Sequence, residues 1–377
     1  MFDYETRRKS LFERMGELGV DAVFLPPSGD LEYLTGFKRR APSFGNVEYA
    51  HSWVTGCFLA PGREPAFVLP RMVVAFDTPD GLTGDVTVVA EIDDGEAIFR
   101  RVARSFGTLR KLAVGARTWA DTVAALLHTF GACELVSADR LVNPMRRVKS
   151  PEELEAMTKA CRIVDETLAV VSSSVRAGVT ELELARDVDF HMRRLGSPTP
   201  SFDTGVFSMG AASERDASVR LSTGELVPGM GVSFDFGAVV DGYCSDFGRT
   251  IHVGAPSAEY ERIYEVVMAA QAAGIAAARP GVPASAVHEA TRRVIVDAGL
   301  GEWFRHRTGH CIGLDVHEHP FISEEDHTPL EVGMTFTIEP SVFRPGHYGV
   351  RVEDVVVCEP SGGRKLNDYP VALVANR

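Results

Sequence analysis

Short apolar runs, separated by turn residues and amphipathic stretches, dominate the first 140 residues of the chain. The stretch TRRKSLFERMGEL places Leu11, Met15 and Leu18 at helical spacing, which predicts an N-terminal helix. Runs such as DAVFLPP, PAFVLP and KLAVGA are short and apolar and are bounded by proline or glycine, as strands commonly are. With a further helix predicted at GEAIFRRVARSF, the pattern indicates a compact α/β domain over residues 1–145, without a cluster of catalytic residues.

Two strong helix-start signals mark the second part of the chain. Ser150 precedes a proline, and Glu153 follows three residues later, so both side chains can satisfy free N–H groups of the first helical turn. Thr180 and Glu183 repeat this pattern and predict a second helix. We therefore expect a second domain over residues 150–377 that begins with a helix pair.

The order of elements in this second domain repeats itself. The hydrophobic pattern predicts a hairpin over residues 232–253, followed by two helices and then three strands, near residues 257–278, 283–299, 310–318, 333–339 and 348–358. A helix pair followed by strands thus occurs twice. This order predicts an α+β domain built from two similar halves around one curved sheet.

Composition narrows the class of protein. The chain has 377 residues, of which 45% are hydrophobic, and its net charge is −13, from 39 basic and 52 acidic residues. These values are typical of a soluble globular protein and disfavour nucleic-acid binding, which needs a basic surface. No stretch of roughly 18 apolar residues predicts a membrane span, and the polar N-terminal stretch lacks a signal-peptide pattern. Six scattered cysteines indicate buried thiols in a reducing compartment, so we expect a cytoplasmic protein.

One hairpin directs two acidic side chains to the same place. In VSFDFGAVVDGYCSDFGRT, residues 232–250, the Asp241-Gly242 pair predicts a two-residue turn, because such turns need positive φ angles. The alternation of side chains along paired strands then puts Asp235 and Asp246 on one face. Two buried carboxylates side by side repel each other, so a cation is expected between them. That cation is either Arg249 or a metal ion; the alternative is a half-exposed turn in which water solvates both aspartates.

Three downstream stretches offer further metal ligands. RTGHCIGLDVHEHP carries three histidines, among them His310. GMTFTIEP and GVRVEDVVV alternate as strands do, and Glu339 and Glu353 take polar positions in these otherwise apolar segments. Together with Asp235 and Asp246, these residues present four carboxylates and one imidazole, whose charge two divalent cations would balance.

A site of this composition predicts metal-assisted hydrolysis. Oxygen-rich ligation suits Mn²⁺, Fe²⁺, Co²⁺ or Zn²⁺ better than a metal selected by thiolates. Two such ions, roughly 3.5 to 4 Å apart, activate a water molecule and polarise a carbonyl oxygen. We therefore expect two divalent metal ions as cofactors.

The order of these motifs resembles the pita-bread metallopeptidases, which include Xaa-Pro dipeptidase (prolidase), aminopeptidase P, methionine aminopeptidase and creatinase. The resemblance rests on two aspartates separated by ten residues, then GHCIGLDVHE, TIEP and VRVEDVVV in that order. The stretches GVDAVFL and LEYLTGF are similar to the N-terminal domain of the prolidase, aminopeptidase P and creatinase branch. The resemblance implies an α/β N-terminal domain, a pita-bread C-terminal domain and a homodimer.

The resemblance also implies a role for each metal ligand. Its five ligand positions are filled by Asp235, Asp246, His310, Glu339 and Glu353. Asp246 and Glu353 would bridge both ions, Asp235 would chelate one, and His310 and Glu339 would hold the other. Glu339 would also act as the general base for the attacking water.

Three further residues are implicated on the substrate side of the site. By the resemblance, His317 would contact the substrate or the tetrahedral intermediate, and His306 would orient the substrate. Arg351 holds either the carboxylates of the site or a carboxylate of the substrate, and a purely structural salt bridge is equally compatible. The HEHP motif places His319 beside the site, where it is interpreted either as a substrate contact or as a solvent-facing histidine.

The chain departs from the family pattern at three places. The family's peptidases usually carry a histidine shortly before the first metal aspartate, but no histidine occurs between residues 192 and 251 of this chain. Cys311 and Ser341 stand where glycine is more common in the family.

Three functions are compatible with these residues. The first is a metal-dependent exopeptidase that hydrolyses Xaa-Pro bonds, as a dipeptidase or an aminopeptidase. The second is an enzyme similar to creatinase or ectoine hydrolase, which acts on a small non-peptide amide or amidine. The missing histidine distinguishes the second from the first. The third is a binding protein without catalysis, which is disfavoured because all five ligand positions are filled.

Overall fold

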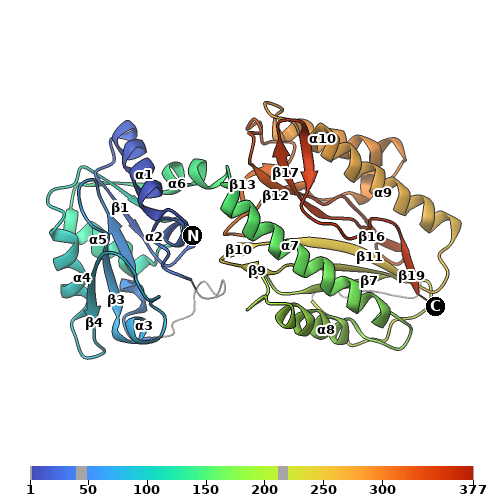
Figure 1. The fold of residues 1–377 in the computed structure, drawn as a ribbon, viewed down its shortest axis with the longest axis horizontal. Helices are drawn as coiled ribbons and strands as arrows, with labels where there is room; N and C mark the ends of the chain where they lie inside the picture. Colours follow the sequence, from blue (N-terminus) through green and yellow to red (C-terminus); the bar gives the residue numbers. More distant parts are fainter. Residues whose placement is uncertain (1, 40–48, 211–219, 377) are drawn as a thin grey trace. The chain divides into compact units, whose positions relative to one another are not determined.

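The computed structural model describes residues 2–39, 49–210 and 220–376. The chain divides into two compact units, residues 1–146 and 147–377 (Figure 1). Among the described residues, no helix combines the length and the apolar character that a membrane span requires.

The N-terminal unit is built around a mixed six-stranded sheet with the order β4-β3-β2-β1-β5-β6. Its strands are β1 (Ala22–Leu25), β2 (Gly56–Leu59), β3 (Ala66–Pro70), β4 (Asp85–Val89), β5 (Lys111–Val114) and β6 (Glu134–Ser137). Its helices are α1 (Tyr4–Leu18), α2 (Gly29–Thr35), α3 (Arg71–Phe76), α4 (Gly95–Arg104), α5 (Ala120–Phe130) and α6 (Asp139–Arg146). Strand β1 pairs antiparallel with β2 and parallel with β5, so the predicted α/β class is confirmed.

The predicted N-terminal helix is present, and two of the three residues at helical spacing are buried. Leu11 and Met15 are fully buried, whereas Leu18 is 46% exposed. Helix α1 ends at Leu18 and is capped by Gly19, which has a φ of 64°. Val20 is buried at this end of the helix instead, as is common after a left-handed helix cap.

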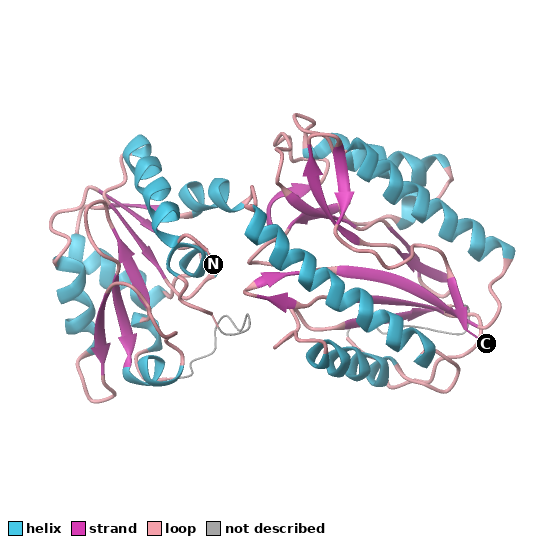
Figure 2. Cartoon of the chain, viewed as in Figure 1, coloured by secondary structure: helices cyan, strands magenta, loops and turns pink. Residues whose placement is uncertain are grey.

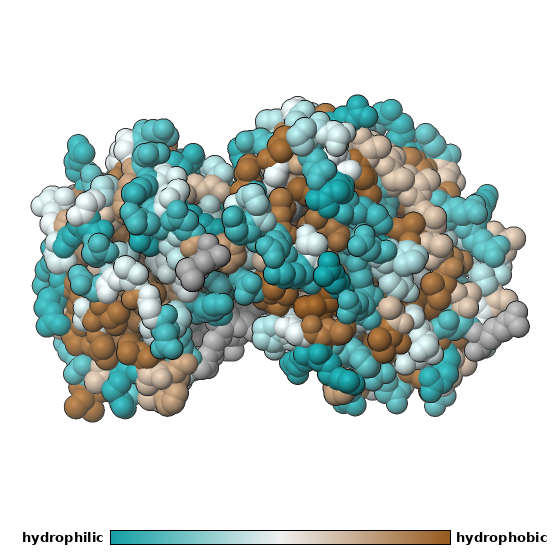
Figure 3. All heavy atoms as spheres, in the orientation of Figure 1, coloured by the Kyte–Doolittle hydropathy of each residue, from teal (hydrophilic) through white to brown (hydrophobic). Residues whose placement is uncertain are grey.

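One edge of the N-terminal sheet exposes apolar side chains. Strand β4 lies at the edge, and its Val86 and Val88 are 39% and 44% exposed. Phe76, at the end of α3, is 68% exposed. Figure 3 shows hydrophobic side chains gathered on this unit in the region of β3 and β4. Exposed apolar surface on an edge strand is characteristic of a contact surface.

The second unit begins with the predicted helix pair, α7 (Pro151–Val171) and α8 (Glu181–Arg194). Both predicted capping boxes are present. The Glu153 N–H donates to Ser150 Oγ, and the Ser150 N–H donates to the Glu153 carboxylate at 2.7 Å. The same reciprocal pair joins Thr180 and Glu183. The second helix pair is α9 (Ala258–Ala277) and α10 (Ala284–Asp297).

Two main sheets and two short ribbons make up the strands of this unit (Figure 2). The first sheet has the order β19-β11-β8-β7, with β7 (Gly205–Met209), β8 (Gly231–Phe236), β11 (Phe247–Val253) and β19 (Val374–Asn376). The second has the order β13-β12-β14-β17-β18, with β12 (Gly309–Cys311), β13 (Glu318–Ile322), β14 (Thr335–Ile338), β17 (Asp354–Glu359) and β18 (Gly362–Lys365). The ribbons pair β9 (Val239–Val240) with β10 (Tyr243–Cys244), and β15 (Ser341–Arg344) with β16 (Tyr348–Arg351).

The two halves predicted from element order are visible in this topology. In the first half the antiparallel strands β8 and β11 are connected through the ribbon β9–β10, and in the second half β14 and β17 are connected through β15–β16. Helices α7 and α8 bury apolar side chains against the first sheet, and α9 and α10 against the strands of the second half. The two sheets are joined by a bridge in which the Glu353 N–H donates to the Gly248 carbonyl oxygen at 2.8 Å.

Two predicted strands are each divided. The strand predicted near residues 348–358 is β16 and β17, which belong to different sheets, and the chain crosses between them at Val352 and Glu353. The strand predicted near 310–318 is β12 and the start of β13, separated by a loop. In both cases the hydrophobic pattern continues without a break where the chain changes the strand with which it pairs. The pattern alone does not reveal such a change.

Candidate metal centre

The predicted hairpin register is confirmed. Asp241 and Gly242 form the turn with φ angles of 50° and 87°, and Tyr243 pairs with Val240. The same register continues into β8 and β11, where Gly248 pairs with Asp235. The two aspartates therefore converge as the sequence predicted.

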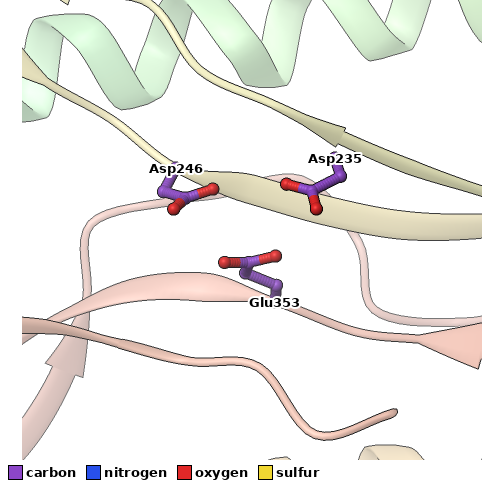
Figure 4. Close-up of side chains that lie close together, drawn as sticks. All are labelled: Asp235, Asp246 and Glu353. Carbon is purple, nitrogen blue, oxygen red and sulfur yellow. The ribbon is translucent and has the colours of Figure 1, made fainter. Parts of the chain in front are cut away.

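Glu353 completes a group of three carboxylates. Asp235 lies on β8, Asp246 directly precedes β11, and Glu353 directly precedes β17, so both halves of the unit contribute (Figure 4). One oxygen from each of the three lies within 4.8 Å of the others. Gly248 permits this approach, because a Cβ at that position would lie 2.7 Å from Glu353 Oε2.

His310 and Glu339 extend the group. His310 Nε2 lies 3.4 Å from Asp246 Oδ2 and 3.5 Å from Glu339 Oε1. On the other side of the ring, Nδ1 lies 3.1 Å from the Cys311 carbonyl oxygen. Because a carbonyl oxygen only accepts, Nδ1 carries a hydrogen and Nε2 is the atom directed at the carboxylates. Thr337 Oγ1 donates to Glu339 Oε1 at 3.1 Å and so orients that carboxylate.

Burial makes the ionised forms of these carboxylates costly. Burial raises the pKa of Asp246 and raises that of Glu353 well above its usual range, and neighbouring carboxylates raise both further. Burial acts on the pKa of Glu339 in the same direction, but the charges of His310 and Arg351 outweigh it and lower that pKa. The cluster therefore needs additional positive charge to be fully ionised.

The residues present fit bound cations. Asp246 Oδ1 and Glu353 Oε2 are buried and accept no hydrogen bond from the residues that the structure describes. A buried acceptor without a donor costs about 1 to 3 kcal/mol, and more when it is charged. A divalent cation bound to these oxygens would remove that cost, and carboxylates with one imidazole are a suitable donor set for Mn²⁺, Fe²⁺, Co²⁺ or Zn²⁺.

Two arginines near the cluster have different partners. Arg351 donates to Asp235, and its guanidinium lies 3.6 Å from Glu353 and 3.9 Å from Glu339. The alternative that Arg249 lies between the two aspartates is wrong. Arg249 is 1% exposed, and its guanidinium forms an ion pair with Asp354 at 2.6 Å. In the strand register Arg249 lies opposite Phe234 on β8, so its side chain projects from the other face of the sheet than that of Asp235.

The histidines predicted on the substrate side lie in different surroundings. The ring of His317 is 4.3 Å from that of His310, and burial, with the charge of His310, lowers the pKa of His317. The ring of His319 packs edge-on against Phe321 at 4.5 Å.

His306 is hydrogen-bonded to Ser341, the serine that stands where glycine is more common in the family. Its Nδ1 lies 2.7 Å from the Arg307 carbonyl oxygen, so Nδ1 carries the hydrogen, and Ser341 Oγ donates to Nε2 at 2.5 Å. Ser341 is fully buried. Burial lowers the pKa of His306, which favours this neutral form.

The sequence pattern did not single out Arg307, whose positive charge is among those that lower the pKa values of His306, His317 and Glu339. A basic residue inside the histidine-rich stretch was the available signal. Within the histidine-free segment that precedes Asp235, residues 211–219 lie outside the described residues.

Comparisons with known proteins match both units of the chain. Residues 155–360 match the model of metallopeptidase family M24, and residues 7–148 match that of the creatinase/prolidase N-terminal domain. An Xaa-Pro dipeptidase from Pyrococcus horikoshii is 36% identical over 248 residues, which cover 64% of this chain and 68% of the relative. A prolidase structure from Thermococcus sibiricus has a TM-score of 0.90 and 29% identity, with 100% of both chains covered. The dipeptidase PepE from Mycobacterium ulcerans has a TM-score of 0.85 and 32% identity, with 99% of each chain covered.

Proposed function

Since the chain belongs to metallopeptidase family M24, we propose that it is a metal-dependent dipeptidase that hydrolyses Xaa-Pro bonds. Family membership confirms the predicted two-part fold and the metallohydrolase class. The observation that carries the proposal is the convergence of Asp235, Asp246 and Glu353 from both halves of the second unit, with buried carboxylate oxygens left without a donor. The named relatives support the choice of Xaa-Pro dipeptides as substrates.

We propose two divalent ions, which Asp235, Asp246, His310, Glu339 and Glu353 would hold. Such ions lower the pKa of water and polarise the scissile carbonyl group. The balance of four carboxylate charges supports a count of two, and Mn²⁺, Co²⁺, Zn²⁺ and Fe²⁺ all suit the donor set.

Side chains of this site would carry out the proton transfer and orient the reacting groups. Glu339 has a lowered pKa and is ionised near neutral pH, so it can accept a proton from the attacking water and deliver it to the leaving proline nitrogen. His317 is neutral and carries an N–H group that can donate to the carbonyl oxygen as negative charge develops there. Arg351 holds the orientation of Asp235 through its hydrogen bond.

Hydrolysis of a small substrate panel tests this function. Purified protein, stripped of metal and reloaded with Mn²⁺, is assayed with Ala-Pro, Gly-Pro, an Xaa-Pro tripeptide, creatine and ectoine. We expect turnover of the Xaa-Pro dipeptides above that of every other compound. Preferred turnover of creatine or ectoine would replace the proposal with the creatinase- or ectoine-hydrolase-like alternative.

We also propose that the chain forms a homodimer in the cytoplasm. The exposed edge of the N-terminal sheet, with Val86, Val88 and Phe76, supports a contact between copies. All six cysteines are buried and unpaired, which supports a reducing compartment. Light scattering of the purified protein tests the dimer, and a mass near that of one chain, 41.0 kDa, would contradict it.

A further inference from the structure

Arg249 is buried beside the metal centre, and its guanidinium is bonded on every side. An arginine carries five N–H donors, and this one makes five hydrogen bonds. Nη1 donates to the carbonyl oxygens of Gly248 and Glu353 at 2.8 and 2.5 Å. The other donors bind the Asp354 carboxylate and two carbonyl oxygens of residues 369–370. The guanidinium is therefore held in one position.

Two of these acceptors belong to the bridge that joins the two halves of the second unit. The Glu353 N–H donates to the Gly248 carbonyl oxygen at 2.8 Å, and that oxygen also accepts Nη1 of Arg249. Gly248 lies two residues after Asp246, and the carboxylates of Asp246 and Glu353 approach each other from the two halves (Figure 4). Arg249 thus binds the peptide groups at the place where the two halves present these carboxylates.

Asp354 extends the contact to a third predicted ligand. Its carboxylate is 0% exposed and accepts from Arg249 at 2.6 Å and from Gln271 Nε2 at 2.9 Å. The same amide nitrogen of Gln271 lies 3.3 Å from the Ile338 carbonyl oxygen, to which it donates. Ile338 directly precedes Glu339, so the path of hydrogen bonds reaches the backbone beside that carboxylate as well.

The side chains of Arg249 and Asp354 do not share the face of the ligands. Successive side chains of a strand point to opposite faces, so Asp354 projects away from Glu353. Arg249 lies opposite Phe234 on β8 and takes the other face of the sheet from Asp235. Arg249 and Asp354 are 1% and 0% exposed, so any effect that they have on the reaction acts through the ligands.

Stability of the fold alone does not require an arginine at this position. Replacing a buried ion pair by apolar residues of similar volume is often neutral for stability or even stabilising. An apolar side chain, however, has no donors for the carbonyl oxygens of Gly248 and Glu353. The bonds of Arg249 are therefore suited to fixing the spacing of the carboxylates.

We infer that Arg249 is a positioning residue of the metal centre, which holds Asp246 and Glu353 in register across the two halves of the unit. This inference rests on the proposed function. Loss of a group that orients a metal ligand commonly lowers metal affinity by about 10- to 100-fold. One ion can adapt to a displaced carboxylate, whereas two adjacent ions that share carboxylates cannot. The affinity for the second ion is therefore expected to fall most.

The test replaces Arg249 with lysine and measures metal binding to the stripped protein. Arg249→Lys keeps the charge beside Asp354, but its three donors on one nitrogen cannot bond both bridge carbonyl oxygens and residues 369–370. In a calorimetric titration with Mn²⁺ below the Tm, the dissociation constant of the second ion is expected to rise by about 10- to 100-fold. At equal metal concentration, electron paramagnetic resonance is expected to show a spin-coupled Mn²⁺ pair in the wild type and mainly isolated Mn²⁺ in the variant.

Arg146→Lys is the matched control. Arg146 is also buried, and it pairs with Asp30 at 2.6 Å, the same distance as that between Arg249 and Asp354, but it belongs to the N-terminal unit. The same substitution in an equally short ion pair thus measures the cost in stability alone. We expect its Tm to fall and both of its Mn²⁺ dissociation constants to match those of the wild type.

Gln271→Met covers the case in which Arg249→Lys does not fold. This substitution changes no charge and removes the donor to Asp354 and to the Ile338 carbonyl oxygen. We expect a weaker second ion here as well, by a smaller factor.

Wild-type affinity for both ions in Arg249→Lys, or in Gln271→Met where Arg249→Lys does not fold, would overturn the inference. Wild-type protein that binds two Mn²⁺ ions but cleaves no Xaa-Pro compound would overturn the proposed substrate, and the binding comparison would still decide the inference. Wild-type protein that binds fewer than two ions would overturn both.

Discussion

The buried ion pair between Lys149 and Glu318 provides a quantitative test of how the site is supported. The two side chains are 1% and 8% exposed, and Lys149 Nζ lies 3.1 Å from Glu318 Oε2. The other oxygen of Glu318 accepts the Asp315 N–H at 3.1 Å. The pair thereby connects the start of α7 to the loop that carries His317.

Replacing Lys149 with methionine keeps most of the length of the unbranched side chain and removes its charge. Loss of one partner of a buried ion pair costs about 3 to 5 kcal/mol, which corresponds to a fall in Tm of roughly 6 to 20 °C for a unit of this size. The Lys149 N–H still donates to the Gly333 carbonyl oxygen, so the backbone contact is retained. We expect turnover to fall as well, because the loop of His317 loses one of its anchors.

Lys159→Met is the control for this prediction. Lys159 pairs with Glu155 at 2.8 Å, but the two side chains are 53% and 67% exposed. An exposed pair of this kind contributes little to stability, so the Tm of this variant is expected to change by less than about 2 °C. Calorimetry on the metal-loaded variants measures both. A Lys149→Met midpoint equal to that of Lys159→Met would refute the reasoning.

Three further substitutions test individual residues of the site. Glu353→Ala should abolish binding of both metal ions, since this residue lies between the two halves of the cluster; full metal content in the purified variant would exclude it as a ligand. His317→Ala should retain metal and lower kcat by about 100-fold or more, as loss of an oxyanion donor commonly does, and an unchanged kcat would remove it from the mechanism. Ser341→Ala should retain metal and release Nε2 of His306 from its hydrogen bond, which nitrogen NMR of the imidazole would detect; an unchanged His306 spectrum would contradict the pairing.

Local signals in the sequence predicted the parts of the fold that depend on neighbours along the chain. The Asp241-Gly242 turn fixed the register of the hairpin and thus the convergence of Asp235 and Asp246. The caps at Ser150 and Thr180 located both helix starts, because the residues that satisfy the first turn are three positions apart.

Features that depend on distant partners were not predictable in the same way. The pattern around Val352 continues as one strand, yet the chain passes there from β16 to β17 because two different strands offer it hydrogen bonds. Strand β6 was missed, since it lies at an edge and buries little of its surface. The partner of Arg249 depends on which face of β11 its side chain takes and on what lies opposite, and local spacing does not encode this.

A titration of metal into stripped protein tests the central claim most directly. Mn²⁺ is added in steps while bound metal per chain and the rate of Ala-Pro hydrolysis are measured on the same sample. The account predicts that the stripped protein is inactive and that activity rises to a plateau as about two ions bind per chain. It also predicts that Asp246→Asn neither binds two ions nor recovers activity. Ala-Pro hydrolysis that is independent of metal, or equal in Asp246→Asn, would contradict it.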